Sequence, residues 1–483
     1  MAPRLFPALI LILFVLLPIS AQETTNEPLT LEAFARSTRL GINHISGVDI
    51  PYDEGRYRRA LELGAGWNRW ALYWNAVETS DSEFTWDRYD DLVTADLNAG
   101  LQIDAVLLGM PSFHRNGDTI RDLYVPIFSD GTDEPGLGKS VNPGNPFARF
   151  VYEAVTRYMP DGTLSREHEW HPERGIRVWE VWNEPDFEPF WSGGVNDYAR
   201  MLKVAYLVIK RTDPQALVMF GGLLYPTHDN WLAEVMRVIE CDPMHEAHNW
   251  FFDAVGVHSY TDAWRSGWLT LYVRQTMIEF GIMRPIWLNE SGATIWDDYP
   301  GATWLTDQPT QRRDAITAEE AANLFIQGAA WAYAEGAQVV FWFQLYDDCG
   351  NQPPGTDFPP NASALCQADQ PCSGESFGIY SNPPGSVCFS QHPEPNSARP
   401  IAAAYQLVSE IFGTVPFSPR GVVDTQSYNG IVTITFSRPQ TDERIVVLWN
   451  TRRREIILNY PALGSQADVY SLDGVEHIQA SFG

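Results

Sequence analysis

The sequence predicts an α/β protein in which a (β/α)8 TIM barrel is followed by a small all-β domain. Apolar β-type runs alternate with longer helical segments between residues 39 and 413, as parallel strands joined by crossover helices require. After residue 413 this alternation gives way to short strands of alternating polarity. The 483 residues, 45% of them hydrophobic, are enough to bury one large core and one smaller core.

Eight apolar runs are expected to form the strands of the barrel. They are Leu40 to Ile45, Trp67 to Trp74, Leu101 to Leu108, Ile176 to Trp182, Ala216 to Gly221, Phe252 to Ser259, Pro285 to Asn289 and Gln338 to Leu345. Helices are expected between them, for example over Trp86 to Ala99, Val195 to Arg211 and Ala318 to Ala334. Their apolar residues recur every three or four positions, which indicates helices that pack one face on a sheet.

The N-terminal segment has the pattern of a secretory signal peptide. Arg4 precedes the apolar run Leu9 to Leu17, and small residues lead to a cleavage site after Ala21. The run is short for a membrane span, although an uncleaved N-terminal anchor is the alternative. We therefore assign residues 1–21 to a signal peptide and expect a secreted or extracytoplasmic protein with no membrane contact after cleavage.

The remaining chain divides into three parts. Residues 22–38 are expected to pack on the β-domain, residues 39–413 form the catalytic barrel, and residues 414–483 form a compact, β-sandwich-like domain. The strands of this last domain are expected at Ile431 to Phe436, Ile445 to Trp449, Glu455 to Leu458 and Asp468 to Ser471. We interpret the domain as a cap on the barrel, with glycan binding as the alternative.

Charge and cysteine content narrow the class of protein. The net charge of −28 disfavours nucleic acid as a partner, while a neutral glycan is compatible with it. In an exported chain, the cysteines of the insertion 347–397 are expected to form two local disulfides, whose pairing among Cys349, Cys366, Cys372 and Cys388 stays open. A zinc site is the less favoured alternative. Cys241 is expected to be a buried free thiol.

Two glutamates stand at the ends of predicted barrel strands. Glu184 lies in the string Trp182-Asn183-Glu184-Pro185 after the fourth run, and Glu290 ends the seventh run. Catalytic groups of (β/α)8 barrels sit at the C-terminal ends of the strands, and cleavage of a glycosidic bond requires two carboxyl groups. The pair predicts a glycoside hydrolase without a metal or another cofactor, acting on a carbohydrate.

These strings are similar to those of clan A of the glycoside hydrolases over most of residues 39–412. The string Val178 to Pro185 and the helix that runs into Asp213-Pro214 look like glycoside hydrolase family 39. The pattern Phe84 to Asp90 is similar to that family and also to families 5 and 42. At the seventh strand, family 39 commonly has Thr-Glu where this chain has Asn289-Glu290.

The resemblance implies a retaining mechanism with Glu184 as the general acid/base and Glu290 as the nucleophile. Two carboxyl groups in these roles are expected to lie about 5–5.5 Å apart, with pKa values moved in opposite directions. Asn183 is then expected to donate a hydrogen bond to the sugar 2-hydroxyl.

Further candidates for the substrate site lie at other strand ends. The resemblance implies that Arg69 and Tyr260 support the nucleophile, that His258 stands beside them, and that Trp342 is the aromatic floor under the sugar. Position alone adds His44 and His114, which end the first and third runs.

The sequence therefore predicts a secreted retaining β-glycosidase that acts on O-glycosidic bonds of a glycan or oligosaccharide. A transglycosidase would use the same two glutamates, and a non-catalytic glycan-binding barrel would not need both. A metal-dependent barrel hydrolase would need a His-x-His pair on the first strand, where Asn43 to Ser46 offers one histidine. The sugar, the linkage and the oligomeric state are not readable from the chain.

Overall fold

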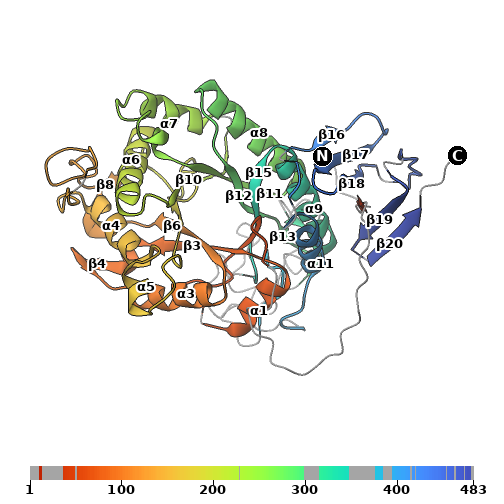
Figure 1. Cartoon of the computed structure of the whole chain (residues 1–483), viewed down its shortest axis with the longest axis horizontal. Helices are drawn as coiled ribbons and strands as arrows, with labels where there is room; N and C mark the ends of the chain where they lie inside the picture. The colour runs from red at the N-terminus through yellow and green to blue at the C-terminus, as the bar shows by residue number, and fades with distance from the viewer. Residues whose placement is uncertain are drawn as a thin grey trace, which may run out of the picture.

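The structure is a computed structural model of the whole chain. It describes residues 10–12, 36–48, 50, 52–136, 138–227, 229–298, 315–347, 376–383, 394–413, 416–418, 420–452, 454–461, 464–472 and 474–479. Figure 1 shows a barrel surrounded by helices, with the all-β domain at one side of it. The four clustered cysteines and most of the predicted signal peptide lie outside the described residues.

Eight parallel strands close the barrel, and each contains part of one predicted run. They are β2 (Leu40–Asn43), β3 (Trp67–Tyr73), β6 (Gln102–Leu108), β9 (Val178–Val181), β10 (Leu217–Leu223), β11 (Ala254–Tyr260), β12 (Ile286–Gly292) and β15 (Ala337–Trp342). Each strand pairs with its neighbours in sequence order, and β15 pairs with β2 to close the ring. The predicted (β/α)8 barrel is confirmed.

Helices follow the barrel strands around the outside. They are α1 (Glu54–Glu62), α3 (Asp87–Asn98), α4 (Pro146–Tyr158), α6 (Val195–Thr212), α7 (Trp231–Glu240), α8 (Ala263–Glu279), α9 (Ala318–Ala334) and α11 (Pro400–Val408). Helix α6 packs through the apolar stripe that the sequence predicts, and its residues Tyr198, Leu202, Ala205 and Ile209 are fully buried. None of the described helices combines the length and the apolar character that crossing a membrane requires.

Short elements occupy the connections. The helical ones are α2 (Trp74–Val77), α5 (Thr163–Glu167), the 3-10 turns at Ser112–His114 and Asn249–Phe251, and a π-helical turn at Ser409–Gly413. The short strands are β4 (Glu78–Ser80), β5 (Glu83–Phe84), β7 (Arg115–Asn116), β8 (Thr119–Ile120), β13 (Thr294–Ile295) and β14 (Ala315–Ile316). Cys241 directly follows α7 and is exposed, so the expectation of a buried thiol is wrong.

The interior of the barrel has an apolar half and a polar half. At the N-terminal ends of the strands, an apolar plug includes Trp67, Met219, Trp287 and Phe341, with the two indole rings 4.8 Å apart. Above this plug the inward side chains are polar and charged. Because the plug closes one end, the chemistry of the barrel is confined to the C-terminal ends of the strands.

The described part of the all-β domain forms one six-stranded sheet. In spatial order its strands are β16 (Val422–Asp424), β17 (Ile431–Arg438), β18 (Glu443–Asn450), β1 (Ile10–Ile12), β19 (Gln466–Ser471) and β20 (Gly474–Gln479). The all-β character is confirmed, but the segment predicted as a strand at Glu455 to Leu458 has no regular structure. Strand β1 belongs to the predicted signal peptide, so cleavage after Ala21 would remove it from the sheet.

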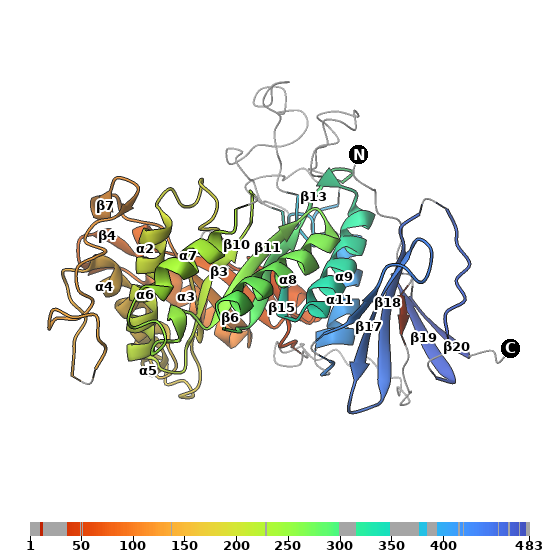
Figure 2. The same ribbon diagram turned by 90° about the horizontal axis from the view of Figure 1, so that it is seen from above.

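The β-domain packs against α9, as Figure 2 shows. The Trp331 ring on α9 meets Trp449 on β18 at 6.0 Å, and Phe412, Phe417 and Phe436 form an aromatic cluster beside it. The backbone of the same helix accepts a hydrogen bond from the Gly421 N–H at 3.2 Å. Aromatic packing and backbone hydrogen bonding therefore join the two parts of the chain.

Candidate active site

The two glutamates face each other at the C-terminal ends of β9 and β12. Glu290 is the fifth residue of β12, and Glu184 lies in the turn after β9, where its N–H donates to the Gly222 carbonyl at 3.0 Å. Trp182 and Glu184 have φ values of 70° and 43°, in the left-handed region that non-glycine residues seldom adopt. Such backbone is typical of functional turns, where the surrounding contacts hold it in place.

Both carboxyl groups are buried and close together. The exposed fraction is 6% for Glu184 and 7% for Glu290. His258 Nδ1 lies 2.7 Å from Glu184 Oε1 and 3.4 Å from Glu290 Oε2, and these three atoms are all within 4.8 Å of one another. Inverting glycosidases separate their carboxyl groups by roughly 6.5–9.5 Å to admit a water molecule, so the spacing here fits the short class.

Arg69 on β3 connects the residues below the glutamates. Its guanidinium donates to both oxygens of Glu180 at 2.7 and 3.0 Å, to Glu290 Oε1 at 2.5 Å and to Asn183 Oδ1 at 2.8 Å. A buried bidentate pair of this kind fixes the plane of the arginine. Arg69 is thus placed as the sequence predicts, between the nucleophile candidate and the turn that carries Asn183.

Glu180 is a site residue that the sequence analysis missed. It is fully buried, and besides Arg69 it accepts from the Gly222 N–H at 2.7 Å and from Asn289 Nδ2 at 3.0 Å. Asn289 precedes the nucleophile candidate, so Glu180 links β9 to both sides of the site. The detectable signal was an acidic residue inside the apolar run Val178 to Trp182, because such a residue is buried only with partners.

The contacts move the pKa values of the two carboxyl groups apart. Burial raises the pKa of Glu184 above its ordinary value, and the nearby Glu290 carboxylate adds to this rise. Burial acts in the same direction on Glu290, but His258, Arg69 and the hydrogen bond from Tyr260 outweigh it and lower the pKa of Glu290. Burial also raises the pKa of Tyr260 well above its ordinary value, so its phenol keeps the proton that it donates to Glu290 Oε2.

Among the described residues, two groups of side chains have the spacing of metal ligands, and each group is bonded to its own arginine. Glu184, His258 and Glu290 form the first group, in which Arg69 donates to Glu290. The second group consists of Glu78, Asp81 and His114, where Arg149 Nη2 lies 2.7 Å from Glu78 and 2.8 Å from Asp81. In each group the guanidinium supplies the positive charge that carboxylates at this spacing require.

His114 lies outside the catalytic cluster. Its ring stacks on Trp74 at 5.1 Å, and its Nε2 lies 3.1 Å from Oε1 of the fully buried Glu78. It therefore packs the connections after β3 and β6, apart from Glu184 and Glu290, whereas the sequence analysis expected it in the substrate site. His44 is different, because it is partly exposed and its ring meets Phe343 edge-on at 5.6 Å beside the catalytic residues.

Trp342 also fails to reach the site, because its side chain is fully buried. Its ring meets Phe325 of α9 at 5.7 Å, and its indole N–H donates to the Phe377 carbonyl at 2.8 Å. The next residue, Phe343, is partly exposed and lies 6.2 Å from the Tyr260 ring and 5.3 Å from the Phe377 ring. The aromatic surface beside Glu290 is therefore built from Phe343, Phe377 and Tyr260.

Replacing Phe343 with alanine is expected to lower kcat/KM about tenfold, because a stacking surface of this kind contributes roughly 1 kcal/mol or more. The matched variant Phe343→Trp restores an aromatic face and should recover most of the loss. Steady-state kinetics on an aryl glycoside that the wild type hydrolyses provides the measurement. Equal kcat/KM for Phe343→Ala and the wild type would contradict this placement.

Asp104 on β6 is an ionisable group with no hydrogen bond in the described structure. It is fully buried, neither of its carboxyl oxygens has a partner at good hydrogen-bond geometry, and Arg69 Nε lies 3.7 Å away. The amide oxygens of Asn43 and Asn289 are also buried without a donor. Burial, and then the Glu180 carboxylate, raise the pKa of Asp104 well above its ordinary value of 3.8, so we interpret Asp104 as a neutral acid.

The neutral state of Asp104 predicts how the free energy of unfolding depends on pH. A group whose pKa is raised on folding stabilises the fold fully below its unfolded pKa, and this contribution is lost as the pH rises toward the folded value. The free energy of unfolding should therefore fall by up to about 1.4 kcal/mol per pH unit above pH 3.8. Asp104→Asn should make this slope shallower, while Asp96, Glu184 and Asp186, whose pKa values burial also raises, keep their own contributions. Urea denaturation of both proteins at pH 5 and pH 7 checks it, and parallel pH dependences would refute the interpretation.

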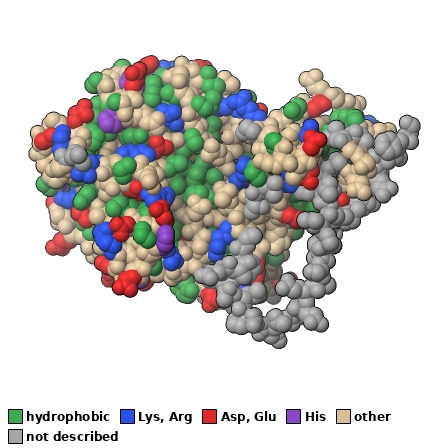
Figure 3. Space-filling model, viewed as in Figure 1, with side chains coloured by type: hydrophobic (Ala, Val, Ile, Leu, Met, Phe, Trp, Pro, Cys, Tyr) green, Lys and Arg blue, Asp and Glu red, His purple; other side chains and the backbone are tan. Residues whose placement is uncertain are grey.

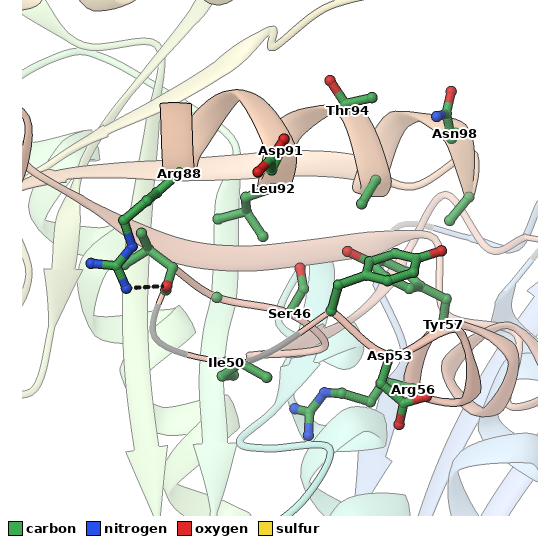
Figure 4. A pocket seen from close by; sticks show the side chains of 15 residues that line it. Ser46, Ile50, Asp53, Arg56, Tyr57, Arg88, Asp91, Leu92, Thr94 and Asn98 are labelled. Atoms are coloured by element: carbon green, nitrogen blue, oxygen red, sulfur yellow. Dashed lines mark hydrogen bonds between the residues drawn. The ribbon is translucent and has the colours of Figure 1, made fainter. Parts of the chain in front are cut away.

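One described cavity lies outside this cluster. It occupies about 490 Å³ between α1, α3 and the connection after β2, as Figure 4 shows. Its lining includes Tyr57, Arg56 and Leu92. The Arg56 guanidinium donates to the backbone carbonyls of His44 and Ile45 at 2.8 and 2.7 Å, so this residue ties the wall of the cavity to the rim of the active site.

The barrel fold is shared with glycoside hydrolases of known structure. The chain is similar to a glucosidase from Croceicoccus marinus, with a TM-score of 0.52 and 14% identity over 84% of this chain and 76% of that one. It is also similar to a family 39 glycoside hydrolase from the gut symbiont Bacteroides cellulosilyticus WH2, with a TM-score of 0.52 and 14% identity over 92% and 74%. No family model matches the chain, and no curated protein matches it. The resemblance predicted from the sequence is confirmed for the fold.

Proposed function

We propose that this protein is a retaining β-glycosidase that hydrolyses O-glycosidic bonds of a glycan by double displacement. The observation that carries the proposal is the pair Glu184 and Glu290. Their facing oxygens lie within 4.8 Å, and their pKa values are moved in opposite directions. One carboxyl group then holds a proton while the other is an ionised nucleophile, as retaining hydrolysis requires.

The contacts support different roles for the two glutamates. Glu290, which accepts from Arg69 and Tyr260, attacks the anomeric carbon, and Glu184 gives its proton to the departing glycosidic oxygen. The bond between the sugar and the leaving group breaks as the bond to Glu290 forms. In the second step Glu184 removes a proton from water, and the resulting attack releases Glu290 and the sugar.

His258 is placed to hold the acid/base. Its Nδ1 lies 2.7 Å from Glu184 Oε1, and its Nε2 lies 3.5 Å from Arg69 Nη2. Burial lowers the pKa of His258, but the Glu290 and Glu184 carboxylates outweigh burial and raise it. The protonation of the imidazole is therefore coupled to the charge on the two glutamates, which changes as Glu184 loses and regains its proton.

The aromatic surface and the polar residues contact different parts of the sugar. Phe343 and Phe377 offer ring surface to an apolar sugar face, and Asn183, held at its oxygen by Arg69, has its amide N–H groups left for a sugar hydroxyl. A transglycosidase would use the same groups and differ in the acceptor. A non-catalytic glycan binder does not account for the opposed pKa values of two buried carboxyl groups.

The pH dependence of kcat/KM should be bell-shaped. The rate rises as the pH passes through the lowered pKa of Glu290, which must be ionised, and falls as it passes through the raised pKa of Glu184, which must be protonated. In Glu184→Gln the alkaline limb should disappear for substrates whose leaving group needs no proton. A pH–rate profile with an activated aryl glycoside checks this, and an unchanged alkaline limb would contradict the assignment.

Hydrolysis of a panel of aryl β-glycosides, followed by proton NMR, tests the function itself. The first-formed sugar should have the β configuration, because two inversions at the anomeric carbon give net retention. An initial α product would overturn the mechanism, and no hydrolysis of any member would overturn the proposed function. Acceptor alcohols added to the same assay separate hydrolysis from transglycosylation. We also propose export of the chain, and N-terminal sequencing of the secreted protein after Ala21 tests it.

A further inference from the structure

Helix α8 carries aromatic side chains on the face that points to solvent. Trp264 is 53% exposed and Trp268 is 43% exposed, and Tyr272 follows one turn later with part of its surface accessible. A helix on the outside of a barrel normally presents charged and polar side chains there. Beside this face, Gly267 packs closely against Trp331 of α9, so α8 is already held against the protein there.

The three rings form a row, which we call the α8 strip. Residues four apart on a helix lie about 6 Å apart along its axis, so the strip spans two such steps. The rings of Trp268 and Tyr272 are 5.2 Å apart with an angle of 10° between their planes, and the Tyr225 ring supports Tyr272 edge-on at 5.3 Å. Within the described residues, neither exposed indole makes a hydrogen bond to another side chain.

The strip begins at the rim of the active site. Helix α8 starts at Ala263, three residues after Tyr260, which donates a hydrogen bond to Glu290. Arg265, between the two tryptophans, points inward and donates to the His258 carbonyl at 3.0 Å. The first turn of the helix is thus fixed to the catalytic strand while its aromatic residues face outward.

We infer that the α8 strip binds the chain of a β-linked polysaccharide next to the catalytic centre. Tyr272 stacks behind Trp268, so the exposed rings of Trp264 and Trp268 are the surfaces that can meet the apolar faces of pyranose units. Their indole N–H groups can donate to sugar hydroxyls. The inference rests on the proposed function for the identity of the ligand. It adds a second carbohydrate site, on the outside of the barrel, that holds the polymer while the catalytic centre acts on one bond.

A second copy of the chain fits this surface less well. A stable protein interface buries about 800 Å² on each partner, whereas a fully buried aromatic side chain contributes roughly 150–250 Å². Two half-exposed tryptophans supply only a fraction of the area a dimer needs. For a sugar chain, by contrast, two or three stacked rings are sufficient contact.

Adsorption to insoluble polysaccharides tests the inference without any turnover. The Glu290→Gln protein is mixed with insoluble β-1,4-xylan, β-1,4-mannan and cellulose, and the bound fraction is measured. We expect adsorption to at least one polymer, and about tenfold weaker adsorption when Trp264→Ala and Trp268→Ala are added, since each stacked ring contributes roughly 0.5–1.5 kcal/mol. The matched control adds Tyr52→Ala and Tyr152→Ala, which remove two exposed rings elsewhere on the surface.

Three results would overturn the inference. They are adsorption to none of the three polymers, equal adsorption of the strip variant and its control, and a strip variant that changes the oligomeric state in gel filtration. Hydrolysis of aryl glycosides by otherwise unaltered proteins that carry the strip or control changes is measured separately. Hydrolysis at the wild-type rate shows that the variants are folded. If hydrolysis occurs without adsorption, the binding site is refuted, and if hydrolysis is absent in the wild type, the glycosidase assignment is refuted.

Discussion

Replacing Glu290 with alanine is expected to lower kcat roughly 10⁴-fold, which corresponds to about 5.5 kcal/mol of transition-state stabilisation. The groups around this carboxylate are the donors Tyr260 and Arg69 and the His258 ring, whose Nδ1 lies 3.4 Å from Oε2, and none of these three is a carboxylate that could take its place. The loss should appear in kcat with little change in folding stability, since alanine removes a buried charge together with its contacts. Stopped or continuous assays with an activated aryl glycoside measure it.

The configuration of rescued products separates the two glutamates. With azide, Glu290→Ala should give an α-glycosyl azide, because azide takes the place of the nucleophile in one inverting step. The matched variant Glu184→Ala should give the β-azide, because azide there attacks the glycosyl-enzyme after the first inversion. The reverse pattern of azide configurations would exchange the two roles, and full activity of Glu290→Ala would remove it from the mechanism.

Replacing Arg69 with methionine is expected to destabilise the fold by about 3–5 kcal/mol and to abolish measurable activity. The change leaves Glu180 and Glu290 buried without the cation that bonds to both. Without that cation the pKa of Glu290 should rise, so the nucleophile becomes protonated in the pH range where the wild type works. The free energy of unfolding from urea denaturation and the pH–rate profile report the two effects separately.

Two matched variants test whether the stability lost in Arg69→Met comes from carboxylates left buried without a cation. Arg157→Met removes an arginine that pairs with Asp90 near the surface, and it should cost about 1 kcal/mol or less. Adding Glu180→Gln to Arg69→Met should recover part of the lost stability without recovering activity. If Arg69→Met were no more harmful than Arg157→Met, Arg69 would not be the cation on which the buried carboxylates depend.

The strands were predictable because the barrel needs runs that are apolar on both faces. That same property conceals which residues point inward, and Trp342 illustrates the problem. Phe341 belongs to the apolar plug inside the barrel, so the alternation along β15 directs Phe343 inward and Trp342 outward to α9. In a run where every residue is apolar, a one-residue error in this alternation places the wrong ring in the site.

Residues that act through other residues were the hardest to find. Glu184 and Glu290 were identifiable because they stand in distinctive strings at strand ends. Glu180 lies within a strand and touches only Arg69, Asn289 and backbone, so its role depends on a neighbour more than a hundred residues away. His114 ends a predicted run as a catalytic residue would, but the pairing of Glu78 and Arg149 draws it into a separate network.

The distribution of charge on the surface bears on the kind of partner that the protein can bind. Figure 3 shows acidic and basic side chains interspersed over the face in view, with no continuous basic area there.

Helix α9 prevents a clean separation of the barrel from the β-domain. Residues 321–330 of this helix are all buried, because one side lies on the barrel and the other lies beneath the β-domain. A fragment that stopped at residue 413 would therefore present Trp331 to water and lose the aromatic partners of Phe412. Barrel and sheet are two regions by topology, but they are expected to melt as one cooperative unit.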